Sequence, residues 1–163
     1  VRKYLTALEG TKTKLLDTRK TLPGLREAQK YAVKVAGGTN HRRGLYDAYL
    51  IKENHIKAYG SISRAIAEAR KMKPDKFLEI EVQNINEFKE AASLKPDMIM
   101  LDNFNLSNLK KAVSINSGLV KLEVSGGIDL DSLANIARTG VDYISVGALT
   151  KNCRAIDFSL LLT

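Results

Sequence analysis

Positively charged side chains gather in three short runs within the first 60 residues of the chain. The runs are DTRKT at 17–21, NHRR at 40–43 and LIKENH at 50–55, and each lies beside an apolar stretch, where a strand would open into a loop. Arginine presents a planar fork to a carboxylate and lysine a point charge. The runs therefore predict a pocket for a small, multiply anionic ligand, with ordinary surface charge as the alternative. The candidate ligand-binding residues here are Arg19, Lys20, Thr21, His41, Arg42 and Lys52.

Two carboxylates follow later apolar segments and are candidates for chemistry on such a ligand. Glu81 and Asp102 are 21 residues apart, each at the end of a predicted strand, and Glu79 shares a strand face with Glu81. Carboxylates placed there suit Mg²⁺ held through water, or stabilise a developing positive charge. The alternative is that they only pair with the pocket's cations. Both interpretations use the same geometry, so the sequence leaves them open.

Glycine-containing loops follow the last two predicted strands. Ser125, Gly126 and Gly127 come after the apolar residues 121–124, and Gly147 stands in the same place one unit later. Glycine lets backbone N–H groups approach an anion closely, and loops after the last two strands of a barrel are a common phosphate site. The pair predicts a phosphate cradle, with two tight turns as the alternative.

These residues must be positioned by alternating strands and helices. Apolar segments predict strands around 15–16, 49–51, 77–82, 98–101, 119–124 and 143–146. Patterns between them predict helices at 1–8, 25–36, 63–72, 87–94, 106–113 and 130–137, with Asn86, Asn105 and Asp129 as N-caps. This alternation indicates a parallel α/β sheet with helical crossovers. Six strands can close as a barrel or stay open as a doubly wound sheet, and the strand count does not decide.

Composition limits the class of protein. The 163 residues carry a net charge of +8, all of it in residues 1–60, which hold 13 Lys/Arg against 5 Asp/Glu. Aromatic side chains do not interleave with the basic runs, which disfavours nucleic acid as the partner. Apolar runs are too short to predict a membrane span, and no signal peptide opens the chain. The single Cys153 allows no intrachain disulfide and fits a reducing, cytoplasmic location. We expect one domain over 1–163.

Short motifs in a fixed order extend over nearly the whole chain. They are GTK at 10–12, DTRKT at 17–21, PGLR at 23–26, KYA at 30–32, GG at 37–38, NHR at 40–42, GL at 44–45, LIKENH at 50–55, EIEV at 79–82, LDNF at 101–104, EVSGGI at 123–128 and GVDYISVGALT at 140–150. In this order and spacing they closely resemble the nicotinate-nucleotide pyrophosphorylase family, also called quinolinate phosphoribosyltransferase. Lys151 departs from the family pattern, which often has histidine there.

The resemblance implies an open, TIM-like α/β barrel of about six strands, without the N-terminal domain of the family. The abrupt start of the chain within a predicted helix agrees with a fragment. The family joins quinolinate to 5-phosphoribosyl-1-pyrophosphate with Mg²⁺ and no organic cofactor, releasing pyrophosphate and CO₂ and giving nicotinate mononucleotide for NAD synthesis. Its N-terminal domain supplies an arginine across a dimer interface, so a homodimer or larger oligomer is expected and the fragment alone is expected to be inactive.

The resemblance also implies a role for each candidate residue. Quinolinate would be held by Arg19, His41, Arg42 and Lys52, with Lys20 close to both substrates. Thr21 would be a further substrate-binding residue. Glu81 and Asp102 would face the ribose and the Mg²⁺–pyrophosphate, and Lys20 and Lys52 complete the catalytic set. Ser125, Gly126, Gly127 and Gly147 would bind the 5-phosphate. Two alternatives stay open, a related phosphoribosyltransferase for another heterocyclic acid and a non-catalytic phosphate-binding module.

Overall fold

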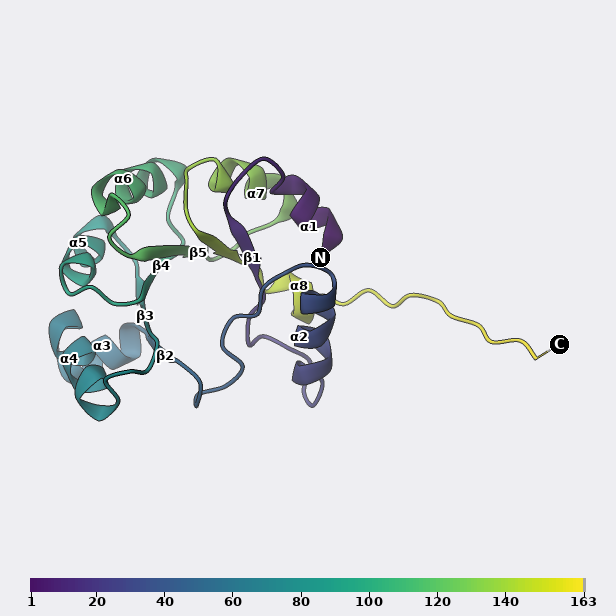
Figure 1. The fold of residues 1–163 in the computed structure, drawn as a ribbon, viewed down its shortest axis with the longest axis horizontal. Helices are drawn as coiled ribbons and strands as arrows, with labels where there is room; N and C mark the ends of the chain where they lie inside the picture. Colours follow the sequence, from purple (N-terminus) through teal and green to yellow (C-terminus); the bar gives the residue numbers. More distant parts are fainter. Residues whose placement is uncertain (163) are drawn as a thin grey trace.

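The computed structural model describes residues 1–162, and its centre is one parallel sheet of six strands. The strands are β1 (Lys14–Leu16), β2 (Tyr49–Ile51), β3 (Leu78–Val82), β4 (Met98–Asp102), β5 (Lys121–Ser125) and β6 (Tyr143–Ser145). Their order is β1-β6-β5-β4-β3-β2, so β1 and β2 are the two edges. The sheet curves round into an open barrel (Figure 1). The predicted α/β class and all six predicted strands are confirmed, and the curvature selects the barrel over the doubly wound sheet.

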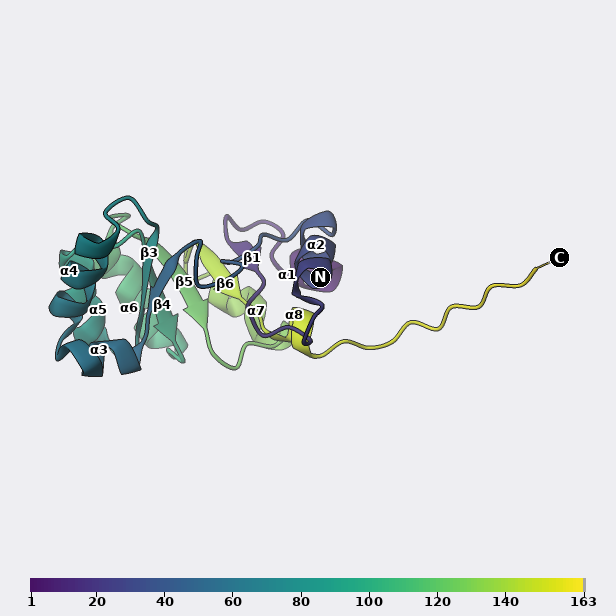
Figure 2. The same cartoon turned by 90° about the horizontal axis from the view of Figure 1, so that it is seen from below.

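Helices cover the convex face of this sheet. They are α1 (Arg2–Ala7), α2 (Arg26–Val35), α3 (Glu53–Tyr59), α4 (Ile62–Met72), α5 (Ile85–Ser93), α6 (Leu106–Asn116), α7 (Leu130–Ala137) and α8 (Ala148–Lys151). Neighbouring helices pack side by side in the order α3, α4, α5, α6, α7 and α1, while α2 and α8 lie together beside the open side (Figures 1 and 2). The concave side is thereby left for side chains of the strands and the loops.

The hydrophobic core lies between the sheet and these helices. Outward-facing strand residues such as Ile80, Ile99 and Leu122 are at most 1% exposed and pack with helix residues such as Phe88 and Leu133. Because successive side chains of a strand alternate between its faces, the residues between them point into the barrel. On β3 and β5 those inward residues include glutamates, which explains why the strands read as apolar segments with acidic interruptions.

Helix starts agree with the predictions at two of three sites. Asn105 accepts a hydrogen bond from Asn108 N at the start of α6, and Asp129 accepts one from Ser132 N at the start of α7. The prediction of Asn86 as a cap is wrong. Asn84 caps α5 instead and accepts from the backbone N–H groups of Asn86 and Glu87. Asn84 and Asn86 are both good capping residues. Where the backbone enters the helix decides which of them caps it.

Two helices were not predicted, α3 and α8. Both begin directly after a strand without an apolar stripe long enough to show a helical period. At the start of α3, the His55 side chain accepts a hydrogen bond from Lys52 N over 3.0 Å. His55 therefore caps a helix and holds the turn that presents Lys52.

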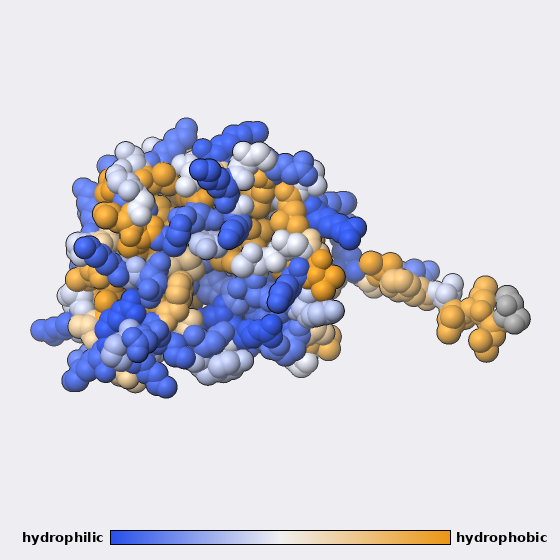
Figure 3. Space-filling model, in the orientation of Figure 1, coloured by the Kyte–Doolittle hydropathy of each residue, from blue (hydrophilic) through white to orange (hydrophobic). Residues whose placement is uncertain are grey.

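The last described residues leave the body of the molecule as an extended segment (Figures 1 and 2). Its apolar side chains, Ile156, Phe158, Leu160, Leu161 and Leu162, are all at least 75% exposed and give the projecting segment its hydrophobic colour in Figure 3. Within residues 1–162, no helix combines the length and the hydrophobicity that crossing a membrane requires.

Candidate functional site

A cavity of about 620 Å³ opens where the carboxyl ends of the strands meet. Parallel strands bring the residues after each strand to the same edge of a sheet. Ten of the twelve predicted site residues line this cavity, namely Arg19, Lys20, His41, Arg42, Lys52, Glu81, Asp102, Ser125, Gly126 and Gly127. They come from the ends of β1 to β5 and from the loop before β2. Residues more than 100 positions apart thus share one pocket.

The other two predicted residues lie beside the cavity without lining it. Thr21 Oγ1 accepts a hydrogen bond from Arg26 Nε over 3.2 Å, which fixes the turn after Lys20. Gly147 is the N-cap of α8, and a side chain there would reach to 3.4 Å from Lys20 Cδ. Gly147 is thus at the same edge of the sheet as the Ser125–Gly127 loop. The Thr21 hydroxyl is used in a contact within the protein, with Arg26.

The cations of the pocket are close enough to affect one another. Burial lowers the pKa of Arg42, and the neighbouring Arg19 guanidinium lowers it further. Like charges held together in a partly buried site favour an anion between them. The Nε atoms of both arginines are buried and have no hydrogen-bond partner among residues 1–162. Arg42 Nη1 donates to the Ala48 carbonyl over 3.1 Å, and Glu79 and Asp47 offset the charge of Arg42 only in part, so the pair is suited to an anionic ligand.

The carboxylates have different partners. Glu81 forms an ion pair with Lys52, across from the end of β2. Asp102 Oδ2 accepts a hydrogen bond from Asn103 Nδ2 over 2.9 Å, a neutral donor. The ion pair of Glu81 agrees with the alternative that these carboxylates only pair with the cations of the pocket. Asp102, bonded to a neutral amide, does not agree with it. Both still face the cavity from neighbouring strands.

The Ser125–Gly127 loop requires glycine at its centre. Gly126 has a φ of +98°, and a side chain at that position would overlap Asn103 Oδ1. Asn103 has a φ of 54°, and its N–H donates to the Ser125 carbonyl over 3.0 Å. The two loops thus hold each other, with backbone close to the cavity. A close backbone approach of this kind is what an anion cradle needs.

Sequence reasoning missed several lining residues, among them Asn103, Glu123 and Ser145. Glu123 is fully buried and Ser145 is 4% exposed, and neither Glu123 Oε1 nor Ser145 Oγ has a hydrogen-bond partner within the described chain. A signal was present, because Glu123 stands two residues before Ser125 and so shares its strand face. The Glu79 carboxylate, two before Glu81, obeys the same rule.

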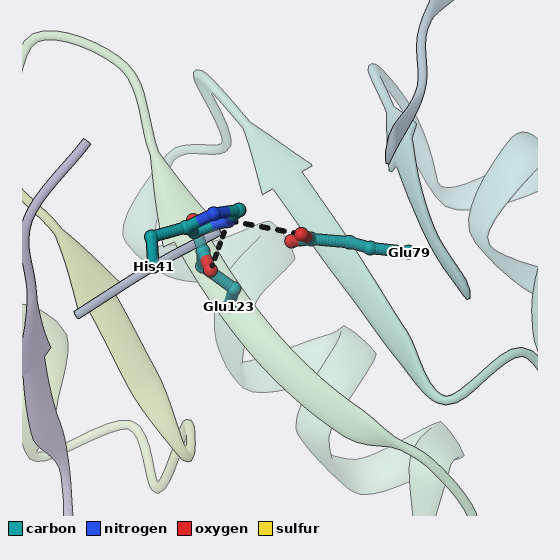
Figure 4. A group of neighbouring side chains, drawn as sticks. All are labelled: His41, Glu79 and Glu123. Carbon is teal, nitrogen blue, oxygen red and sulfur yellow. Dashed lines mark ion pairs between the residues drawn. The ribbon is translucent and has the colours of Figure 1, made fainter. Parts of the chain in front are cut away.

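His41 lies inside the barrel between Glu79 of β3 and Glu123 of β5 (Figure 4). Its Nε2 is 2.9 Å from Glu79 Oε2 and 3.3 Å from Glu123 Oε2. In the neutral imidazole, Nδ1 accepts a hydrogen bond from Arg42 N over 2.7 Å, which places the single ring proton of that form on Nε2. A histidine and two carboxylates would suit a divalent cation, but this assignment leaves no lone pair on Nε2 for a metal ion.

This cluster retains a proton that isolated side chains would release. Burial alone would lower the pKa of His41, but the carboxylates of Glu123 and Glu79 outweigh it and raise the pKa to about 10. Burial and the neighbouring Glu123 raise the pKa of Glu79 to about 7. One shared proton leaves the three groups with a net charge of −1, whichever atom carries it. The floor of the cation pocket is therefore weakly negative.

Comparison with known proteins agrees with this geometry. The family model described as the C-terminal domain of quinolinate phosphoribosyl transferase matches residues 1–161. The chain belongs to this family. It is 46% identical to the nicotinate-nucleotide pyrophosphorylase [carboxylating] of Mycobacterium leprae over 160 residues, covering 96% of this chain and 56% of that protein. It is 41% identical to a probable nicotinate-nucleotide pyrophosphorylase [carboxylating] of Bacillus subtilis over 163 residues, covering 99% and 56%.

A solved structure of the nicotinate-nucleotide pyrophosphorylase from Francisella tularensis superposes with a TM-score of 0.93 at 55% identity, covering 96% of this chain and 56% of that one. The family resemblance inferred from the motifs is thus confirmed. The chain spans a little over half the length of these family members.

Proposed function

We propose that the full-length protein transfers the phosphoribosyl group of 5-phosphoribosyl-1-pyrophosphate to quinolinate, with loss of CO₂, to give nicotinate mononucleotide and pyrophosphate for NAD synthesis. The observation that carries this proposal is one cavity that combines cations, carboxylates and a glycine loop. A diacid, a ribose reaction centre and a phosphate need these three kinds of group respectively. Relatives of the same family carry names for the same reaction.

The pyridine diacid would lie on the cation side of the cavity. Arg19 and Arg42, whose Nε atoms lack partners, suit its two carboxylates, and Lys52 lies across from them at the end of β2. Hydrogen bonds to charged groups contribute about 1.5–3 kcal/mol each. Holding both carboxylates fixes the ring nitrogen toward the ribose. Thr21 and His41 shape this side through the turn after Lys20 and the loop before β2.

The sugar phosphate would lie on the glycine side. The Ser125–Gly127 loop and the neighbouring Gly147 turn are at the same edge of the sheet, and Lys20 lies against Gly147. Backbone N–H groups of such loops bind an anion without the cost of ordering long side chains. Lys20 would thereby contact the phosphoribosyl group as well as the diacid.

The reaction itself needs positive charge to be stabilised at the ribose. The bond from C1 of the ribose to pyrophosphate breaks with its electron pair on pyrophosphate, and the ring nitrogen forms the new bond to C1. Glu81 and Asp102 line the cavity and would face the position where this oxocarbenium-like charge develops. These carboxylates, one of them bound only by a neutral amide, also fit Mg²⁺ held through water. When bound, the metal ion would neutralise charge on the departing pyrophosphate.

Decarboxylation then follows without an organic cofactor. The ring nitrogen is now cationic, and the bond from the adjacent ring carbon to its carboxylate breaks, leaving the electron pair on that carbon as CO₂ departs. A proton from water completes the product. The cation pocket would hold the remaining carboxylate in place. We also propose that the protein acts in the cytoplasm as a homodimer or larger oligomer.

The test is product formation by the full-length protein with quinolinate, phosphoribosyl pyrophosphate and Mg²⁺. Nicotinate mononucleotide, pyrophosphate and CO₂ should appear in equal amounts. Calorimetric titration should give tighter binding of quinolinate than of nicotinate, which has one carboxylate. Preference for another heterocyclic acid would favour the related transferase, and phosphate binding without turnover would favour the binding module.

The acidic pair gives a second test. Glu81→Gln and Asp102→Asn should each lower turnover at least tenfold while the melting temperature changes little, because these side chains act on the reacting centre. Glu90→Gln, on the exposed face of α5, is the matched control. Near-normal turnover with a large fall in melting temperature would show that the pair only neutralises cations.

A further inference from the structure

A buried ion pair lies behind the cation pocket and does not line it. Lys30 of α2 and Asp17, the residue after β1, are both 0% exposed, and Lys30 Nζ is 2.5 Å from Asp17 Oδ1. Lysine and aspartate are almost never fully buried unless paired. A buried ion pair contributes little net stability compared with apolar residues of the same size. A role in positioning accounts for its presence better than a role in stability does.

The pair holds the backbone of His41 from both sides. The His41 N–H donates to Asp17 Oδ1 over 2.8 Å, and Lys30 Nζ donates to the His41 carbonyl over 2.9 Å. The peptide groups on either side of His41 thus each have a charged partner. Charge-assisted hydrogen bonds are shorter and stronger than neutral ones. Rotation of this part of the loop would break both.

Asn40 completes the network. Its Nδ2 donates to Asp17 Oδ2 over 2.6 Å and to the Lys30 carbonyl over 2.8 Å. Asp17 therefore accepts from three donors, and both of its oxygens are used. The loop is also tied to β1 through the backbone, because Thr39 N donates to Leu15 O and Asp17 N to Thr39 O.

The network connects three of the predicted diacid-binding residues. Asp17 precedes Arg19 by two positions, and Arg42 directly follows the clamped His41. Arg42 N also donates to His41 Nδ1, so the same loop conformation sets the imidazole orientation. Arg19 and Arg42 repel each other and lack partners for their Nε atoms. Apart from the hydrogen bond that Arg42 Nη1 donates to the Ala48 carbonyl over 3.1 Å, the backbone that carries the two arginines must hold them close together.

We propose that Asp17, Lys30 and Asn40 are positioning residues, which hold Arg19, His41 and Arg42 in the arrangement that binds the diacid. The assignment of the ligand rests on the proposed function. We call Asp17, Lys30 and Asn40 the clamp. It holds the loop whether or not a ligand is bound, because Asp17 and Lys30 bond to the His41 backbone. Removing it should loosen the loop, weaken diacid binding and leave the phosphate side of the cavity in place.

The experiment compares Lys30→Met and Asn40→Ala with wild type in the full-length protein. Lys30→Met should raise the dissociation constant for quinolinate about tenfold and Asn40→Ala about threefold, with that for phosphoribosyl pyrophosphate changed less than twofold. Asn116→Ala is the matched control, since Asn116 is buried and bonded to Val120 far from the cavity. Equal weakening of both ligands, or quinolinate binding unchanged in a folded variant, would overturn the proposal.

A double-mutant cycle separates positioning from general destabilisation. If Lys30 acts through Arg42, then Lys30→Met should cost much less quinolinate affinity in an Arg42→Ala background, because contacting residues are not additive. Full additivity would assign Lys30 a structural role only. Lys30→Arg, which keeps the charge, should restore part of the affinity.

Hydrogen exchange of the His41 amide tests the clamp without any ligand. Exchange should be much faster in Lys30→Met and Asn40→Ala than in wild type, and unchanged in Asn116→Ala. If wild type binds no quinolinate, the proposed function fails, and this measurement still decides the clamp. Unchanged exchange in both variants overturns it. Should Lys30→Met not fold, Asn40→Ala carries the same test.

Discussion

His41 stands between two buried charged clusters that differ in how completely their polar atoms are bonded. On its backbone side, Asp17, Lys30 and Asn40 satisfy one another and the His41 peptide groups. On its side-chain side, Glu79 Oε1 and Glu123 Oε1 lack hydrogen-bond partners in the described chain, and Glu123 Oε2 has only the contact of 3.3 Å with His41 Nε2. The charged residues of both clusters are at most 1% exposed, so their burial does not distinguish the clusters.

The difference indicates what each cluster is for. Nearly all buried polar groups in folded proteins are paired, since an unpaired one costs about 1–3 kcal/mol. We call the clamp of Asp17, Lys30 and Asn40 the saturated cluster, and Glu79 with Glu123 the unsaturated cluster. Both oxygens of Asp17 and the Lys30 ammonium are bonded within the protein, so the saturated cluster can only hold its neighbours in place. Glu123 of the unsaturated cluster lines the cavity together with Arg19, Arg42 and Ser145, each of which has a buried polar atom without a partner among residues 1–162. We therefore expect changes in the first to affect stability most, and changes around the second to affect ligand binding most.

The largest effect is expected for Asp17→Ala. The substitution leaves Lys30 buried without an opposite charge and should lower the free energy of unfolding by about 3–5 kcal/mol. Glu123→Gln in the unsaturated cluster should change it by about 1 kcal/mol or less, since Glu79 remains beside His41. Urea unfolding of both variants checks the contrast, and equal losses would remove the distinction between the clusters.

Next in size are Arg42→Ala and Lys52→Ala. Each should weaken quinolinate binding by about 1.5–3 kcal/mol, the contribution of a hydrogen bond to a charged group, with a smaller change for phosphoribosyl pyrophosphate. Calorimetry with each ligand gives both values. Equal losses for the two ligands would mean that the cations do not form a dedicated diacid pocket.

Gly126→Ala tests the glycine loop. A residue with a side chain pays about 1–2 kcal/mol at a positive φ, and here it also overlaps Asn103. Phosphate and phosphoribosyl pyrophosphate should bind at least tenfold more weakly. Gly118→Ala is the matched control, because Gly118 also has a positive φ of +81° but open space around it. It should lose stability and keep ligand affinity.

The last prediction is a pH dependence of stability from the His41 cluster. The pKa of His41, raised to about 10 by Glu123 and Glu79 against the effect of burial, lies above the 6.5 of an unfolded histidine. Its stabilisation is therefore complete below pH 6.5 and is lost as the pH rises toward 10. The melting temperature should fall over that range, with the fall reduced in His41→Gln. The other charged groups beside His41 are the adjacent Arg42 and the ion pair of Asp17 and Lys30 on its backbone side.

Much of the fold was predictable from the sequence because buried parallel strands are short apolar runs at a near-constant interval. All six strands were predicted by their Ile, Leu, Val and Met residues. The helices α3 and α8 were missed because they carry no apolar stripe of sufficient length. The cap of α5 was assigned to Asn86 in place of Asn84, since both are good capping residues and the chain path alone decides.

The sequence by itself determined the chemical inventory of the site, since cations, carboxylates and glycines after strands meet at one edge of any parallel sheet. Only the tertiary structure decided which of them point at one another. The loop before β2 enters the barrel and brings His41 to Glu79 and Glu123, 38 and 82 residues away. The helical pattern gave no sign that Lys30 is buried, because a lysine on a helix is ordinarily solvated. Its burial follows from where α2 packs, a long-range contact that local pattern does not encode.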